Sequence, residues 1–96
     1  MVSKSEILAS LQKHRAELEQ RFSVSRIGLF GSYLHGNADE ESDIDVLVDL
    51  AEPTFDHYME LKFFLEDLFH HLVDLVLAET VKPRLKPFIA QEVVYA

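Results

Sequence analysis

The chain has 96 residues, no cysteine and a formal net charge of −8, from 9 Lys and Arg against 17 Asp and Glu. The lack of cysteine excludes disulfides, thiolate zinc sites and cysteine nucleophiles, and the acidic balance argues against direct nucleic-acid binding, which needs a basic face. No apolar run is long enough to span a bilayer, and the polar N-terminus does not resemble a secretory signal. We therefore expect one cytoplasmic domain over residues 1–96, with no membrane association.

The hydrophobic periodicity predicts helices and strands that alternate along the chain. In chain order, the expected elements are a helix over 4–21, a strand over 25–30, a short helical turn from Ser32 to Gly36, a strand over 43–49, a helix over 57–70, a strand over 72–77 and a helix within 80–94. Helices that connect short strands in this order pack on one sheet. The sequence therefore predicts an α+β fold, with a small mixed β-sheet flanked by helices.

Local signals mark the helix ends and faces. The stretch Ser3-Lys-Ser-Glu6 has the spacing of a capping box, and Asp56 is the expected cap of the second long helix. The expected apolar face of that helix consists of Leu61, Phe64, Leu65 and Leu68, with Leu72 beyond its end. His70 and His71 point in different directions on a helix, so we expect them to interact with the helix C-terminus rather than to form a metal pair.

Two aspartates separated by one residue begin the second expected strand. In an extended chain, residues i and i+2 project to the same face, about 6.6–6.8 Å apart, so Asp43 and Asp45 should point together while Ile44 and Val46 point to the other face. Paired carboxylates repel unless one is protonated or a divalent cation lies between them, and oxygen ligands favour Mg²⁺, Mn²⁺ or Ca²⁺. The alternative is a charged turn that starts a strand, and the acids at 39–41 are interpreted as ordinary solvated charge.

Two further features lie at or near other expected strands. Gly31 follows the first expected strand, where a glycine lets a ligand approach the backbone, and Ser32 offers a hydroxyl and an N–H to phosphate oxygens. Asp74 is alone in the apolar run over 72–77, where a buried carboxylate is expensive unless it is paired or bound to a cation. If this strand neighbours the strand over 43–49, Asp74 completes a cluster of three carboxylates. The alternatives are an ordinary turn at Gly31-Ser32 and a solvent-facing edge position for Asp74.

Together these residues resemble the nucleotidyltransferase superfamily that includes DNA polymerase beta. The superfamily pattern is Gly-Ser, ten residues, Asp-x-Asp and a third acid on a later strand. Here Gly31-Ser32 is followed by residues 33–42, then by Asp43-Ile-Asp45 and later by Asp74. Within this superfamily the chain resembles the minimal nucleotidyltransferases, the MNT or MntA-like proteins, and the similarity covers nearly the whole chain. The matching stretches are Ile27–Ser32, Ser42–Val48, Val73–Val76 and Lys82–Pro87.

This resemblance implies an activity, a cofactor and a partner. Family members are commonly antitoxins paired with a HEPN-domain ribonuclease toxin, and the activity that the resemblance implies is transfer of AMP from ATP to a tyrosine of that toxin. The expected function is therefore that of a protein adenylyltransferase antitoxin in a hetero-oligomer with such a toxin. The resemblance also implies that Asp43, Asp45 and Asp74 are catalytic and bind two Mg²⁺ ions, with Mn²⁺ as an alternative. It implies further that the β- and γ-phosphates of ATP reach Gly31 and Ser32.

One departure from the family pattern concerns positive charge. Relatives often carry basic residues just after Gly-Ser, where the triphosphate charge lies, whereas this chain has Tyr33-Leu34-His35. Lys62 and Arg84 are the expected substitutes as nucleotide-binding residues, with Lys86 as a third candidate. The alternative is that each of these is a solvated surface charge.

Two other functions stay open at this stage. The first is a non-catalytic antitoxin whose acidic surface covers basic residues of the toxin, an interpretation favoured by the net charge and by the missing basic residues after Ser32. The second is transfer to a small molecule, as in aminoglycoside-modifying relatives, for which this chain is short of a separate substrate domain.

Overall fold

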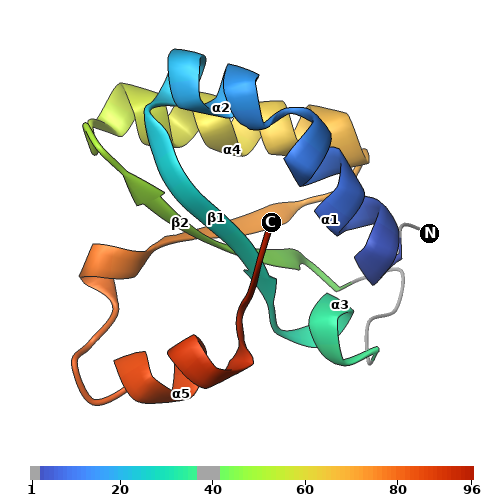
Figure 1. Ribbon diagram of the computed structural model, residues 1–96, viewed down its shortest axis with the longest axis vertical. Helices are drawn as coiled ribbons and strands as arrows, with labels where there is room; N and C mark the ends of the chain where they lie inside the picture. The colour runs from blue at the N-terminus through green and yellow to red at the C-terminus, as the bar shows by residue number, and fades with distance from the viewer. Residues whose placement is uncertain (1–2, 37–41) are drawn as a thin grey trace.

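The computed structural model describes residues 3–36 and 42–96 and shows helices packed on a small sheet (Figure 1). In chain order, the elements are α1 (Lys4–Lys13), α2 (Arg15–Phe22), β1 (Val24–Phe30), α3 (Ser32–His35), β2 (Ile44–Leu50), α4 (Phe55–Phe69), β3 (Val73–Leu77), the 3₁₀ helix η1 (Ala78–Thr80), α5 (Lys86–Glu92) and β4 (Val94–Tyr95). The predicted α+β class is confirmed. The acids at 39–41 lie outside the described residues.

The sheet is mixed, as predicted, and its strand order is β3-β2-β1-β4. β1 pairs antiparallel with β2 and with β4, whereas β2 and β3 run parallel. A parallel pair needs a crossover connection, and α4 supplies it. The parallel register places Asp45 opposite Asp74, so two acids far apart along the chain lie at the same end of the sheet.

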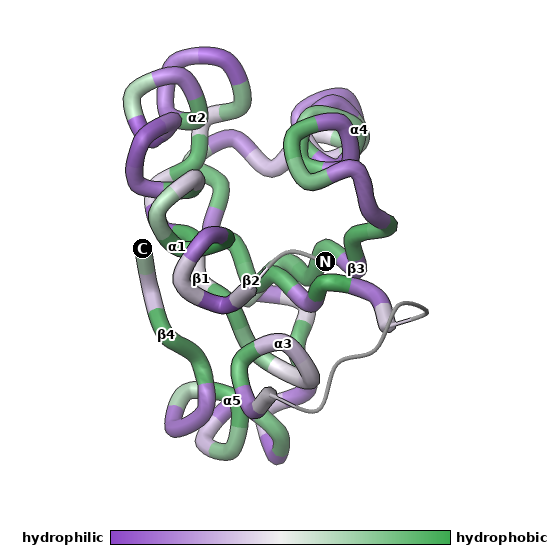
Figure 2. The backbone as a smooth tube through the Cα atoms, turned by 90° about the vertical axis from the view of Figure 1, so that its right-hand side faces the viewer, coloured by the Kyte–Doolittle hydropathy of each residue, from purple (hydrophilic) through white to green (hydrophobic). Residues whose placement is uncertain are grey.

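The hydrophobic core lies on one face of the sheet. α1, α2 and α4 cover this face, whereas α5 lies on the other side, and both views agree on this arrangement (Figures 1 and 2). Core side chains that are at most 1% exposed include Ile44, Val46 and Val48 of β2 and Leu61 and Leu65 of α4. Because side chains alternate along a strand, Asp45 and Asp74 project from the face opposite to this core.

The helix expected over 4–21 is divided at His14 into α1 and α2. The predicted cap at its start is confirmed, since the Ser3 hydroxyl accepts a hydrogen bond from the Glu6 N–H. At the break, both the backbone N–H and the ring Nδ1 of His14 are bonded to the Ser10 carbonyl oxygen. A side chain that enters the backbone ladder interrupts a helix, and His14 has a non-helical φ of −98° and ψ of 11°.

The start and the apolar face of α4 differ from the prediction. Thr54, not Asp56, is the N-cap, because Thr54 has the extended backbone of a capping residue and its hydroxyl accepts from the His57 N–H at 3.1 Å. Asp56 therefore lies within the first turn. The expected apolar position Leu72 is wrong as well: it is 66% exposed, while Phe69 of α4 is buried in its place.

The C-terminal segment adds a strand that the periodicity did not reveal. β4 pairs with β1 at Gly28 and Leu29, and the Ala96 N–H donates to the Ile27 carbonyl oxygen at 2.9 Å. A Cβ atom at Gly28 would lie 2.7 Å from Val93 Cγ2, so the absence of a side chain lets the C-terminal segment approach β1. No helix among the described residues is both long and apolar enough to cross a bilayer.

Candidate active site

Asp45 and Asp74 form the centre of the acidic site. Each is the second residue of its strand, and the parallel register of β2 and β3 sets them side by side. Their carboxyl groups interact through a hydrogen bond as well as through charge. The condition stated for a carboxylate cluster, that the strand with Asp74 neighbours the strand with Asp45, is therefore met.

The surroundings of Asp45 favour its protonated form. The pKa of its carboxyl is raised to about 6, first by partial burial and then by the charge of Asp74, the hydrogen bond with Asp74 and the charge of Asp43. The Ser32 N–H donates to the carboxylate and acts in the opposite sense, lowering the pKa. A bound cation would relieve the repulsion between the Asp45 carboxylate and its acidic neighbours.

Gly31-Ser32, the candidate phosphate-binding segment, lies against the carboxyl group of Asp45. Its φ of +76° is a conformation that residues with side chains rarely adopt, and a Cβ atom at this position would lie 2.0 Å from Asp45 Oδ2. Phe30 is paired with Asp45 in the β1–β2 register, which explains why the next residue meets the aspartate. The Gly-Ser and Asp-x-Asp segments predicted from the sequence are therefore in direct contact.

Asp43 lies just outside the sheet. β2 begins at Ile44, one residue later than expected, so Asp43 is an exposed residue in front of the strand. Its charge still raises the pKa of Asp45, which shows that the two carboxylates are electrostatically close. The predicted burial of Ile44 and Val46 on the opposite face is confirmed.

The donor chemistry of these three aspartates fits a hard divalent cation. Carboxylate oxygens are the ligands that Mg²⁺ prefers, and the repulsion at Asp45 is the unfavourable interaction that such an ion would remove. In the part of the chain that the structure describes, no three acidic or histidine side chains are gathered into a ready group of metal ligands. The residue types therefore suit the ion, while their ligand geometry is not preformed.

The residues after Ser32 do not supply positive charge at the surface. Tyr33 is 4% exposed and belongs to the hydrophobic core. The His35 Nε2 lies 2.5 Å from a carboxylate oxygen of Glu92 in α5, so this ring is already engaged with an acid. The departure from the family pattern is thus visible in the structure as well.

The two basic candidates lie in different parts of the fold. Arg84 is exposed in the turn between η1 and α5. Figure 1 shows α5 on the side of the sheet opposite α1, α2 and α4. Lys62 belongs to α4, next to the buried Leu61, and α4 covers the opposite face. Of the two, only Arg84 is next to a helix, α5, on the side of the sheet that Asp45 and Asp74 face.

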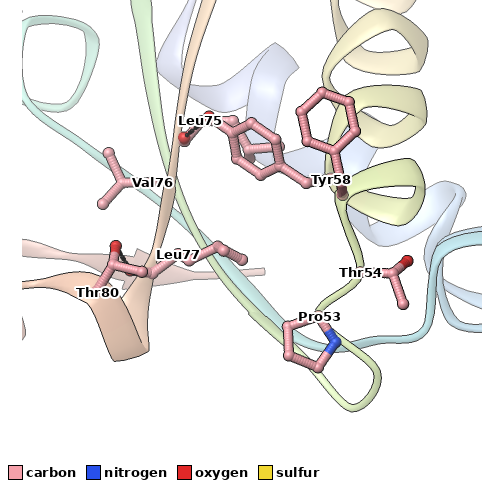
Figure 3. Close-up of a pocket in the computed structure, with 8 residues that line it drawn as sticks. Pro53, Thr54, Tyr58, Leu75, Val76, Leu77 and Thr80 are labelled. Atoms are coloured by element: carbon pink, nitrogen blue, oxygen red, sulfur yellow. Dashed lines mark hydrogen bonds between the residues drawn. The ribbon is translucent and has the colours of Figure 1, made fainter.

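One pocket lies between the start of α4 and the edge strand β3 and has a volume of about 400 Å³ (Figure 3). It is lined by Pro53, Thr54, Phe55, Tyr58, Leu75, Val76, Leu77 and Thr80. None of these residues is acidic or basic, so the pocket offers no charge to a triphosphate or a metal ion. Figure 3 shows Tyr58 reaching from α4 to β3, where its hydroxyl donates to the Leu75 carbonyl oxygen at 2.6 Å.

A second pocket, of about 360 Å³, is lined by residues of α5, η1 and the sheet. Within it, Arg26 and Asp49 form an ion pair at 3.1 Å, and the Arg26 guanidinium lies 4.3 Å from the centre of the Tyr95 ring. Asp49 projects from the same face of β2 as Asp45 but is paired with a base. Of the two acidic residues on this face of β2, Asp49 is thus neutralised by Arg26, whereas Asp45 is repelled by neighbouring carboxylates.

The fold and the acidic site together define a nucleotidyltransferase domain. The model of the nucleotidyltransferase domain family matches residues 11–96, and the chain belongs to this family. The protein adenylyltransferase MntA of Thermococcus cleftensis is 43% identical over 96 residues, which cover 99% of this chain and 97% of that protein. A Methanocaldococcus jannaschii protein with a provisional adenylyltransferase name is 38% identical over 99 residues, with 99% of both chains covered.

Solved structures show the same fold. A structure described as a minimal nucleotidyltransferase is 33% identical, covers 91% of this chain and 93% of its own, and superposes with a TM-score of 0.74. A chain in a toxin–antitoxin crystal structure with AMP-PNP is 25% identical, with a TM-score of 0.70 and coverage of 88% and 70%. The resemblance to MntA-like minimal nucleotidyltransferases and the enzyme class, a nucleotidyltransferase of the protein adenylyltransferase type, are confirmed.

One contact near the site was missed from the sequence. His71 was interpreted only as a charge at the end of α4, but its ring is bonded to the Ser42 carbonyl oxygen, next to Asp43. No local pattern reveals this bond, because the two residues are 29 positions apart.

Proposed function

We propose that this chain is a Mg²⁺-dependent protein adenylyltransferase that transfers AMP from ATP to a tyrosine of a cognate HEPN-domain toxin and thereby neutralises it. The observation that carries the proposal is the contact of Gly31 with Asp45, which faces Asp74 across the β2–β3 register. This contact joins a backbone suited to phosphates with carboxylates suited to a cation. We further propose that residues 1–96 act as a single domain.

Gly31 and Ser32 are the proposed contacts of the β- and γ-phosphates. Gly31 presents backbone without a side chain, and Ser32 adds a hydroxyl that suits a phosphate oxygen. Arg84 is the proposed additional partner of the triphosphate charge, since its turn leads into α5, which lies on the side of the sheet that the acids face. Lys62 stays a weaker candidate because α4 covers the other face.

Asp43, Asp45 and Asp74 are the residues that would hold Mg²⁺, with two ions expected and Mn²⁺ as an alternative. When bound, the metal supplies neutralisation of charge at the phosphates and alignment of the reacting oxygens. The aspartates themselves need no raised pKa for this role, and their common position at one end of the sheet supports it.

The proposed transfer is an in-line displacement at the α-phosphorus of ATP. The tyrosine oxygen forms a new bond to this phosphorus, and the bond from the phosphorus to the bridging oxygen of the β-phosphate breaks. Pyrophosphate leaves with that electron pair. The proton of the tyrosine hydroxyl passes to a carboxylate oxygen of Asp74, the exposed member of the Asp45–Asp74 pair.

The proposed partner is a HEPN-domain toxin in a hetero-oligomer. Support comes from the likeness to the chain of the toxin–antitoxin structure with AMP-PNP, and from the 43% identity to an adenylyltransferase named MntA. The net charge of −8 also suits a partner with a basic surface.

The test is incubation of the chain with ATP, Mg²⁺ and its cognate toxin, followed by mass spectrometry of the toxin. The wild type should add the mass of AMP to a tyrosine, and the double variant Asp43→Asn/Asp45→Asn should lower the rate by about 100-fold or more. Asp49→Asn is the matched control, because Asp49 shares the strand and the face but is paired with Arg26. Equal modification by the double variant would show that the site is wrongly assigned.

The second candidate function is neutralisation by binding alone, without catalysis. It is favoured by the absence of basic residues after Ser32, where Tyr33 is buried and His35 contacts Glu92. The same double variant separates the two functions. If it still protects cells while the toxin stays unmodified, binding is sufficient.

A further inference from the structure

His71 connects segments that come from three parts of the chain. It lies in the turn between α4 and β3, and its Nε2 is hydrogen-bonded to the Ser42 carbonyl oxygen. The same nitrogen lies 3.3 Å from the hydroxyl oxygen of Tyr33 in α3, and the two rings meet edge to face with centres 5.8 Å apart. One imidazole therefore contacts α3, the segment before β2 and the turn before β3.

Each of these contacts lies next to a proposed site residue. Ser42 directly precedes Asp43, Tyr33 directly follows Ser32, and His71 itself stands three positions before Asp74. A second link runs in parallel, since the Ile44 N–H donates to the Leu72 carbonyl oxygen at 3.0 Å. Movement of the His71 ring would thus change the relative positions of the three acid-bearing and phosphate-binding segments.

The hydrogen-bond partners assign the tautomer of His71. A carbonyl oxygen can only accept, so Nε2 carries the hydrogen and donates it to the Ser42 oxygen. The Tyr33 oxygen, at 3.3 Å from the same nitrogen, is then a second and weaker acceptor. The bond to Ser42 thus depends on a donor at the ε position of the ring.

The turn that carries His71 is itself fixed. Glu66 accepts the His70 and His71 backbone N–H groups at its carbonyl oxygen, the latter at 3.3 Å. The Glu66 side chain accepts from the Val73 N–H at 3.0 Å. His70 has a left-handed φ of 52°, which directs the chain out of α4. The turn that carries the His71 imidazole thus has few alternative conformations, because Glu66 binds three of its backbone N–H groups.

We propose that His71 is a positioning residue: its Nε2–H holds the Ser42–Asp43 segment against the start of β3 and so keeps Asp43 in place relative to Asp74 for AMP transfer. It contacts neither nucleotide nor toxin in this role. This inference rests on the proposed adenylyltransferase function. A small misplacement of groups at a reacting centre strongly lowers the rate of the reaction. The His71–Ser42 contact therefore matters for catalysis although His71 does not touch the substrate.

The test compares three substitutions of His71. In His71→Gln the amide nitrogen reaches the position of Nε2 and can still donate to the Ser42 carbonyl oxygen. In His71→Asn the side chain is too short, because its amide nitrogen corresponds to Nδ1 and does not reach that oxygen. His71→Ala removes the donor altogether. His70→Asn is the matched control, because Asn tolerates the left-handed backbone and His70 is exposed at the helix end.

The first readout is amide hydrogen exchange of the free protein. Exchange at the Ile44 amide should be about fivefold to tenfold faster in His71→Asn and His71→Ala, in line with the loss of one hydrogen bond, and near the wild-type rate in His71→Gln and His70→Asn. Equal exchange in all four variants would overturn the proposed link. Because this readout needs no nucleotide and no toxin, it remains informative if the wild type transfers no AMP, a result that would refute the proposed function instead.

The second readout is the rate of AMP transfer to the toxin. It should fall about tenfold to 100-fold in His71→Asn and His71→Ala and recover in His71→Gln. If an active wild type is matched by His71→Asn, or if His71→Gln is as slow as His71→Ala, the positioning role is wrong. Thermal unfolding of all four variants identifies loss of the fold, and the Gln–Asn comparison keeps the test valid if His71→Ala does not fold.

Discussion

At Gly31, the backbone conformation and the neighbouring carboxylate exclude any side chain. Its φ is +76°, and a Cβ atom would lie 2.0 Å from Asp45 Oδ2. Gly36 has the same φ of +76°, yet no atom of the described residues lies within 4 Å of the Cβ position there. The two glycines share a backbone requirement, and only the first also has a spatial one. They therefore form a natural pair for separating conformational strain from crowding at the site.

We expect Gly31→Ala to lower the free energy of unfolding by about 2 kcal/mol or more, because it adds a clash with Asp45 to the strain of a left-handed backbone. Gly36→Ala should lose only about 1 kcal/mol, the cost of the backbone conformation alone. Urea denaturation monitored by circular dichroism gives both values. Equal losses in the two variants would contradict the close packing of Gly31 on Asp45.

The raised pKa of Asp45 predicts how stability depends on pH. A carboxyl with a pKa of about 6 in the folded chain and 3.8 in the unfolded chain binds more protons when folded, so the free energy of unfolding falls as pH rises from about 4 to about 6. Solvent screening at this partly exposed position limits the contribution to about 1 kcal/mol. In metal-free buffer, Asp45→Asn should remove this loss, since its side chain does not ionise.

Asp49→Asn is the control for this measurement, because Asp49 lies on the same strand beside a base. Denaturation curves at pH 4, 5, 6 and 7 compare the two variants with the wild type. A pH dependence in Asp45→Asn that equals the wild-type dependence would show that Asp45 is not the titrating group.

At the scale of elements, the edge strand β3 has three of its outward backbone groups bonded to side chains. The Tyr58 and Thr80 hydroxyls donate to the Leu75 and Leu77 carbonyl oxygens at 2.6 and 2.8 Å. The Glu66 carboxylate accepts from the Val73 N–H at 3.0 Å. An unprotected edge invites pairing with another chain, and these three bonds remove part of that opportunity.

Tyr58→Phe should therefore lower the free energy of unfolding by about 1 kcal/mol, because the Leu75 carbonyl oxygen loses its only donor among the bonds assigned to it in the described residues. Phe63→Leu is the control, since Phe63 lies on the same helix and is 55% exposed. Chemical denaturation measures the first effect, and light scattering at high concentration reports any new association. A stability equal to wild type would mean that water replaces the hydroxyl without cost.

Elements with a strong local signal were predictable from the sequence. The strands around Asp45 and Asp74 follow from alternating and continuous apolar residues, and the Ser3 cap follows from its spacing to Glu6. The proximity of the two aspartates was predictable only as a condition, because sequence spacing does not determine which strands are neighbours. The crossover connection through α4 sets β3 beside β2 and so brings the two aspartates together.

Other elements depend on contacts that no window of sequence contains. β4 has two residues and no period of its own, and it forms because Gly28 leaves room beside β1. The break at His14 depends on its ring bonding the Ser10 carbonyl oxygen, where apolar spacing predicts one continuous helix. The link from His71 to Ser42 likewise joins residues that are distant along the chain.

At the scale of the whole molecule, negative charge exceeds positive charge by eight, and part of it is concentrated at one end of the sheet. Self-repulsion of this kind opposes the compact state, and a cation bound only by the folded chain stabilises it by mass action. The proposed metal site thus links nucleotide chemistry to the stability of the entire chain.

Mg²⁺ at ten times its dissociation constant should raise the free energy of unfolding of the wild type by about 1.4 kcal/mol. Asp45→Asn/Asp74→Asn should show no such increase, whereas Asp49→Asn should behave like the wild type. Thermal unfolding with and without Mg²⁺, at constant ionic strength to equalise screening, measures the difference. An equal shift in the double variant would show that Mg²⁺ acts elsewhere on the acidic surface.

Gly28 has a consequence for the time course of folding in the cell. The edge of β1 opposite β2 is paired with residues 94–96, which a ribosome synthesises after every other partner of that strand. Until they emerge, β1 presents a bare edge opposite the β1–β2 pairing, even if the rest of the sheet has formed. The nascent chain is therefore open to wrong associations at this edge until residues 94–96 have emerged and paired with β1.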